Sequence, residues 1–170
     1  MKKCILFLLW GLLNFPAFGQ QGFIKDFQEK WSNSMDYTVE VAEAMPADKY
    51  DYQPTEDQMN FESQLLHMMS NINWLTTSYL NGEAVSFDLK STDYSKERLI
   101  EMLKIAYGNA AAAVKELKEA DLEEQVDFFA GPKSKRQIIT LLNDHSTHHR
   151  GQLIVYMRLN NIKPPRYRGW

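Results

Sequence analysis

Apolar side chains recur every three or four residues through four long segments of this 170-residue chain. This spacing is typical of amphipathic helices. The segments cover about residues 23–45, 61–79, 95–117 and 134–160. No segment shows a sustained period-two alternation with β-branched residues and hairpin turns. The sequence therefore predicts an all-α fold, a four-helix bundle formed by a single domain.

Local signals place the ends of these helices. Asn60 and Ser95 are suitable N-caps, and Ser134-Lys-Arg-Gln137 fits a capping box. Asn81-Gly82 is a suitable stop for the second helix. The run from Ala110 to Ala113 would let a neighbouring helix approach closely.

The N-terminal residues have the pattern of a signal peptide. Lys2-Lys3 precedes an apolar run from Ile5 to Leu13, and Ala17-Phe18-Gly19 suits a peptidase that cuts before Gln20. The run is shorter than the roughly 20 residues needed to span a bilayer, so we expect no stable membrane anchor. We expect a signal peptide at residues 1–19, a mature domain at 20–170, and a periplasmic or secreted protein. An uncleaved N-terminal hydrophobic helix is the alternative.

Charge and cysteine content limit the partners and ligands. The chain has a formal net charge of −3, and removal of residues 1–19 takes away two lysines and no acids. An acidic chain argues against nucleic acid as a partner. The single cysteine, Cys4, lies before the apolar run and would leave with the signal peptide. A metal in the mature protein would then need histidine or carboxylate ligands.

Two histidines fall on the expected inward stripe of the fourth helix. Steps of four and three residues connect its members: Ile138, Leu142, His145, His149, Gln152, Tyr156 and Leu159. A spacing of four places His145 and His149 on one face, where both can reach a single ion. His67 is the one histidine outside this segment, among Ser63, Asn71 and Trp74. Buried imidazoles without partners would cost about 1–3 kcal/mol each, so a divalent metal shared by three histidines is favoured over isolated core histidines.

His148 is the remaining histidine, about 100° around the helix from His149. It could point to solvent, replace His149 as a ligand, or shuttle protons. Of the polar groups within a turn of the ligands, which include Asn71, Gln152 and Tyr156, it alone titrates near neutrality. His148 is therefore the candidate catalytic acid or base.

The stretch from Asp144 to Gln152 resembles the H-x-x-x-H-R-G-Q signature of the DinB/YfiT-like family. The resemblance extends to the upstream His67, to the connection with Tyr50, Tyr52 and Pro54, and to the ending Asn161-Ile-Lys-Pro-Pro165. It implies a four-helix bundle with a divalent metal. We expect zinc, with nickel, iron or manganese as alternatives. The implied ligands are His67, His145 and His149, which favours His149 over His148. Homodimers are common in the family, and its name does not imply DNA binding.

Other signature and tail residues carry weaker expectations. Gly151 costs about 1 kcal/mol inside a helix relative to alanine, which suggests close helix packing. Arg150 could reach a substrate anion, but an ion pair with an acid on another helix is favoured. Tyr167 and Trp170 could line the site or a dimer seam, but packing of the C-terminus onto the bundle is preferred.

Three neutral nitrogens would leave an ion its full charge and an open position. The resemblance implies a metal-dependent hydrolase or a thiol-dependent S-transferase. The expected export favours hydrolysis of a small molecule, because the thiol cosubstrates of the family are mainly cytoplasmic. No H-E-x-x-H or Glu-x-x-His pair is present, which argues against a metalloprotease and a di-iron centre. A non-catalytic metal-binding or ligand-binding bundle is the remaining alternative.

Overall fold

A computed structural model describes residues 22–91 and 94–170 of the chain. The predicted signal peptide at residues 1–19, with Cys4, lies outside these residues. In the described part, no helix combines the length and the apolar composition that a bilayer crossing requires.

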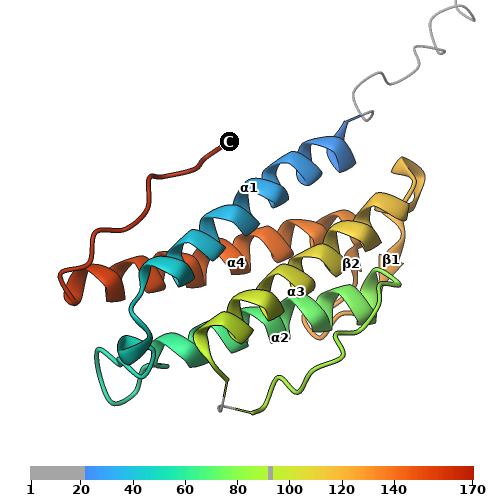
Figure 1. The fold of residues 1–170 in the computed structure, drawn as a ribbon. Coiled ribbons are helices and arrows are strands. Elements are labelled where there is room, and N and C mark those ends of the chain that lie inside the picture. The colour runs from blue at the N-terminus through green and yellow to red at the C-terminus, as the bar shows by residue number, and fades with distance from the viewer. Residues whose placement is uncertain (1–21, 92–93) are drawn as a thin grey trace, which may run out of the picture.

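Four long helices lie side by side and form the bundle (Figure 1). They are α1 (Phe23–Ala44), α2 (Phe61–Tyr79), α3 (Lys96–Glu116) and α4 (Lys135–Leu159). Helix α1 packs on α3 and α4, and α2 packs on the same two helices. The predicted four-helix architecture is confirmed.

The short elements were not predicted. They are the 3₁₀ helices η1 (Ala47–Lys49) and η2 (Glu119–Glu123) and the strands β1 (Gln125–Val126) and β2 (Lys133–Ser134). The strands pair antiparallel, with Gln125 opposite Ser134 and Val126 opposite Lys133. Two residues per strand are too few to produce a period-two pattern, so the sequence carries no signal for this hairpin. It leads directly into α4.

Side-chain caps begin three of the long helices, as expected. Asn60 Oδ1 accepts a hydrogen bond from Ser63 N at 2.7 Å, and Ser95 Oγ accepts one from Arg98 N at 3.2 Å. Ser134 and Gln137 form a reciprocal capping box at the start of α4. These caps satisfy backbone donors that have no partner inside the helix.

The stop after α2 depends on a close approach to α3. Asn81 adopts a left-handed conformation, with φ 56°. A Cβ atom at Gly82 would lie 2.3 Å from Thr76 Cγ2 and 2.8 Å from Ala113 Cβ. Glycine is therefore the residue type that fits at position 82, where the chain passes close to the alanine run of α3.

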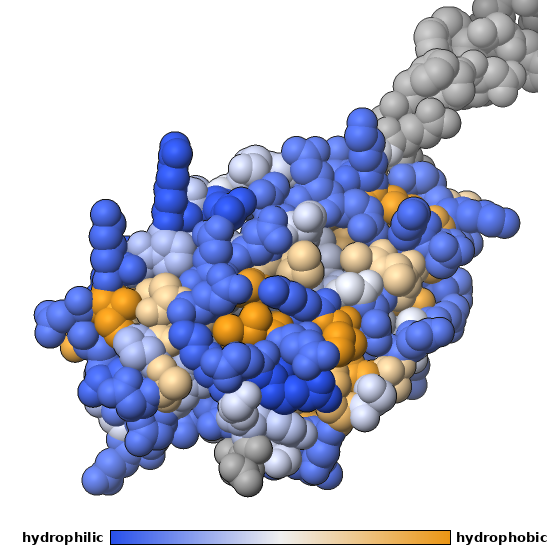
Figure 2. Space-filling view, in the orientation of Figure 1, coloured by the Kyte–Doolittle hydropathy of each residue, from blue (hydrophilic) through white to orange (hydrophobic). Residues whose placement is uncertain are grey.

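Aromatic and aliphatic side chains fill the core between the helices. Trp31 of α1 stacks on Tyr107 of α3 with ring centroids 4.4 Å apart, and Trp31 Nε1 donates to Tyr107 O at 2.9 Å. The face seen in Figure 2 is mostly hydrophilic, with small apolar patches that are separated from one another. Most of the large apolar side chains of the described residues lie inside the bundle.

Two expectations about α4 are wrong. Leu159 is 56% exposed, whereas Leu153, Tyr156 and Met157 are buried. A strict seven-residue stripe drifts about 20° per heptad on a straight helix, so by Leu159 it has left the core. Gly151 is exposed, and a Cβ atom there would meet nothing within 4 Å. Close helix packing does not explain this glycine.

Candidate metal centre

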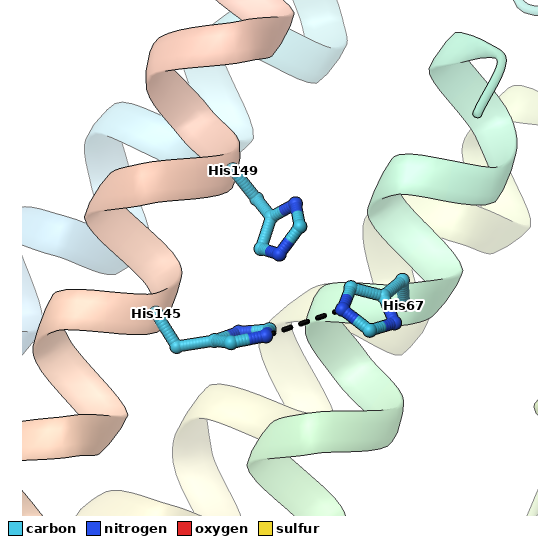
Figure 3. Close-up of side chains that lie close together, drawn as sticks. All are labelled: His67, His145 and His149. Atoms are coloured by element: carbon cyan, nitrogen blue, oxygen red, sulfur yellow. Dashed lines mark hydrogen bonds between the residues drawn. The ribbon is translucent and has the colours of Figure 1, made fainter. Parts of the chain in front are cut away.

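The three predicted ligands converge between α2 and α4. His67 extends from α2, and His145 and His149 extend from successive turns of α4 toward it (Figure 3). Each residue offers one ligand atom, and these atoms all lie within 4.8 Å of one another. His149 is 7% exposed, while His67 and His145 are more accessible to solvent. The site is therefore closed on the core side and open on the other.

The donor geometry fits a single divalent ion. The Nε2 atoms of His67 and His145 are 3.2 Å apart. Two nitrogens bound to one tetrahedral zinc lie about 3.3 Å apart, given a Zn–N distance of about 2.0–2.1 Å. Within the described residues, the group that could hold a metal contains three histidines and no carboxylate.

The protein environment favours neutral imidazoles. Burial, reinforced by the neighbouring histidines, lowers the pKa values of His145 and His149 to about 4. Burial also lowers the pKa of His67. Near pH 7 all three rings are therefore neutral, which is the form that binds metal.

Gln64 contacts the site from the buried side and was missed by the sequence reasoning. Its side chain is fully buried on α2, and its Oε1 atom lies 2.6 Å from His149 Nδ1. A ligating histidine usually donates its other ring N–H to such an acceptor. One signal was available: Gln64 lies three positions before His67 and so on a neighbouring part of its face.

His148 lies beside the centre but outside the group of three. It is exposed, and its ring meets that of His149 edge-on, with centroids 4.9 Å apart. Gln152 Nε2 lies 2.8 Å from His148 Nε2. His148 therefore occupies the rim, where a role in proton transfer stays a prediction.

Trp74, which was expected near His67, belongs to an aromatic cluster formed by α2 and the hairpin loop. Trp74 is tilted against Phe128 and Phe129, with centroids 5.7 and 6.2 Å away. Phe128 is buried, but Phe129 is 83% exposed. Between His67 and Trp74, Asn71 Oδ1 is buried and has no hydrogen-bond partner among the described residues.

Arg150 does not form the expected ion pair in the described part of the chain. Its buried guanidinium faces α1, where Nη1 donates to Ser34 Oγ at 2.7 Å and to Thr38 Oγ1 at 3.2 Å. Nη2 donates to Thr147 Oγ1 at 3.2 Å, and the Tyr37 ring lies beneath the guanidinium. Hydroxyl groups and an aromatic face thus replace the predicted carboxylate. Arg150 secures α4 to α1, whereas the histidines lie between α4 and α2.

The C-terminal tail packs along α1, as preferred from the sequence (Figure 1). Tyr167 meets Tyr37 edge-on at 6.2 Å, and Lys30 Nζ lies over the Trp170 ring at 4.8 Å. Arg168 pairs with Glu40. The tail therefore lies on the α1 side and not beside the three histidines.

Solved structures of three bacterial proteins share this fold. A DinB-like protein from Bacillus cereus ATCC 10987 superposes with a TM-score of 0.76 at 19% identity, over 85% of this chain and 97% of the other. The DinB-like protein YjoA of Bacillus subtilis gives a TM-score of 0.71 at 23% identity, over 85% of this chain and 99% of the other. A conserved protein from Enterococcus faecalis gives 0.64 at 12% identity, over 79% and 95% of the two chains.

Sequence comparison agrees with the structural likeness. The chain is 27% identical to YjoA of Bacillus subtilis strain 168, described as uncharacterised, over 124 residues that cover 71% of this chain and 80% of that protein. The model of the DinB family matches residues 19–168. With a four-helix fold, a three-histidine group that could hold a metal ion and a match over most of its length, the chain belongs to the DinB family.

Proposed function

We propose that this protein binds one divalent ion, zinc in the first place, through His67, His145 and His149, and hydrolyses a small molecule there. The observation that carries the proposal is the convergence of three histidine nitrogens within 4.8 Å of one another. Their lowered pKa values support it, because the rings are neutral near pH 7 without help from a metal.

A bound ion would supply Lewis acidity, which polarises a substrate oxygen and makes water easier to deprotonate. The chain's own groups would do the rest. His148 at the rim is placed to take up or release a proton. Gln64 closes the core side of the site and is itself fully buried. The solvent-accessible side, at His67 and His145, would admit the substrate.

The aromatic cluster suggests what the substrate carries. Trp74 follows His67 by seven residues, which is two helical turns, so both lie on nearly the same face about 10 Å apart. Phe129 leaves an aromatic ring exposed beside Trp74. A substrate with a flat apolar group about two helical turns from the scissile bond would contact both regions.

A thiol-dependent S-transferase is the second candidate. One observation favours it: within the described residues, the metal-competent group contains no carboxylate that could serve as a base for water. A thiol loses its proton more easily than water and needs less help from a base.

The decisive experiment combines metal analysis with turnover. Protein purified without chelators is analysed for its elements, beside His145→Ala and the neighbouring control His148→Ala. We expect close to one equivalent of metal in the wild type and in His148→Ala, and little in His145→Ala. Hydrolysis of an ester and amide panel should stop with chelator and return with zinc. Dependence on an added small thiol would instead identify the transferase, and a fully stable wild type that never takes up metal would refute the proposal.

The cellular location belongs to the same proposal. The N-terminal pattern predicts cleavage before Gln20 and export. N-terminal sequencing of protein recovered from the periplasm or medium should begin at Gln20. Recovery of the intact chain from the cytoplasm alone would contradict it.

A further inference from the structure

A buried chain of hydrogen bonds begins at a backbone carbonyl and ends at the proposed metal ligand His149. Tyr156 OH lies 2.9 Å from Met59 O, just before α2. A carbonyl oxygen can only accept, so the single phenolic hydrogen of Tyr156 is committed to Met59. Toward its other neighbours, the Tyr156 oxygen must act as an acceptor.

That commitment fixes the orientation of the Gln64 amide. Gln64 Nε2 lies 3.2 Å from Tyr156 OH and 2.6 Å from Gln152 Oε1. Both of these oxygens need a donor, and the amide NH₂ supplies two hydrogens. The reverse orientation would place the Gln64 carbonyl against the Tyr156 oxygen, which has no hydrogen left to give. Gln64 Oε1 therefore faces His149.

The Gln64 carbonyl in turn fixes the proton on His149. Oε1 lies 2.6 Å from His149 Nδ1, and an amide oxygen can only accept. His149 therefore carries its proton on Nδ1, which leaves the lone pair on Nε2. Gln64 is fully buried, and Tyr156 and His149 are 3% and 7% exposed, so water has little access to replace any member.

We propose that Gln64 and Tyr156 are positioning residues that hold the His149 proton on Nδ1 and so preset Nε2 as the atom that binds metal. An imidazole without such a partner exchanges its proton between both nitrogens and presents an N–H to the ion part of the time. The consequence for affinity depends on the metal binding proposed above. The tautomer itself is a property of the metal-free protein.

The test compares four variants of the full chain with the wild type. Gln64→Met keeps the volume but removes the acceptor. Gln64→Glu keeps an acceptor toward His149, and its second oxygen can accept from Gln152 once that amide turns its NH₂ toward it. Tyr156→Phe removes a hydroxyl that does not contact the ion site itself, because Gln64 and His149 stand between them in the hydrogen-bond chain. Thr76→Val is the control, because Thr76 is a buried residue of the same helix, 1% exposed, whose hydroxyl has no partner among the described residues.

Two measurements separate positioning from a structural role. Nitrogen-15 spectra of the histidine rings report the tautomer without metal, and competition with a coloured chelator gives the zinc dissociation constant. We expect Nδ1–H in the wild type and in Thr76→Val. Gln64→Met should shift His149 toward Nε2–H and weaken zinc binding about 10- to 100-fold, the usual effect of losing such a partner. Gln64→Glu should restore Nδ1–H and the affinity, and Tyr156→Phe should give a mixture of tautomers and a smaller loss.

The rescue by glutamate is the sharpest outcome. If Gln64 merely filled the core, a buried carboxylate would be at least as harmful as methionine, and that result would overturn the proposal. So would a Gln64→Met protein with an unchanged His149 tautomer and unchanged affinity. If the wild type binds no zinc, the proposed function fails, but the spectra of the metal-free protein still decide whether Gln64 sets the tautomer.

Discussion

His67 Nε2 on α2 and His145 Nε2 on α4 lie 3.2 Å apart, although the two residues are 78 positions apart in the chain. Two nitrogen lone pairs at this separation either share a proton or share an ion. The arrangement joins the two helices, so metal binding would couple directly to bundle stability.

The lowered histidine pKa values predict unusual acid tolerance of metal binding. Protons compete with the metal only as the pH approaches a ligand's pKa, which is about 4 for His145 and His149. Zinc affinity should therefore change little between pH 8 and about pH 6, where ordinary histidine sites begin to weaken. Chelator competition over this range is the measurement. A loss of affinity that is already half complete at pH 6.5 would contradict the prediction.

The same shifts predict how the metal-free protein responds to acid. Below pH 6.5 these histidines take up protons in the unfolded chain but stay neutral in the folded one until about pH 4. The unfolded state then binds more protons, so the free energy of unfolding should fall as the pH drops from 6.5 toward 4. Urea unfolding at several pH values checks this. The His145→Gln variant lacks one of these titrating histidines. Its free energy of unfolding should therefore depend less steeply on pH.

Arg150 should matter for stability and not for metal binding. Arg150→Met keeps much of the stem but leaves the Ser34 and Thr38 oxygens without their buried donor. We expect a loss of about 1–3 kcal/mol in the free energy of unfolding. Metal content should be unchanged, because the guanidinium faces α1. The control is Arg98→Met, whose ion pair with Glu101 is exposed and should contribute less than about 1 kcal/mol.

Local chemistry made some of this structure predictable. The caps at Asn60, Ser95 and Ser134 depend on residues within three positions, so sequence alone located the helix starts. The four-residue spacing of His145 and His149 likewise guaranteed a shared face. That His67 would join them needed the count of histidines and the family resemblance, because the pairing of α2 with α4 is not a local property.

Two of the missed features depend on which helix lies opposite. An acidic partner was predicted for Arg150 because arginine commonly forms ion pairs. At that point, however, α1 presents the hydroxyl groups of Ser34 and Thr38. Gln64 was passed over because its value lies in a contact with His149, on another helix. The hairpin is too short to leave a pattern. Periodicity identifies the buried face of a helix but not what it meets.

Gly151 and Gly82 form a matched pair for substitution by alanine. Gly151 lies inside α4 with open space at its Cβ position, so Gly151→Ala should raise the free energy of unfolding by about 0.5–1 kcal/mol. Gly82→Ala should destabilise the protein, because the new methyl would lie 2.8 Å from Ala113 Cβ. Thermal and urea unfolding measure both. A destabilised Gly151→Ala would show that this glycine has a packing role after all.

The exposed ring of Phe129 provides a test of the proposed substrate class. If a flat apolar group of the substrate packs on Phe129 and Trp74, then Phe129→Ala should reduce kcat/KM for esters with an aryl group in reach. The expected loss is about two- to tenfold, as for one aromatic contact of about 0.5–1.5 kcal/mol. Acetyl esters, which are too short to reach the cluster, should be hydrolysed at the wild-type rate. Tyr167→Ala is the control, because Tyr167 is similarly exposed, at 77%, but packs against Tyr37 on the α1 side. Equal losses for aryl and acetyl esters would instead mean that Phe129 supports the hairpin loop and does not contact the substrate.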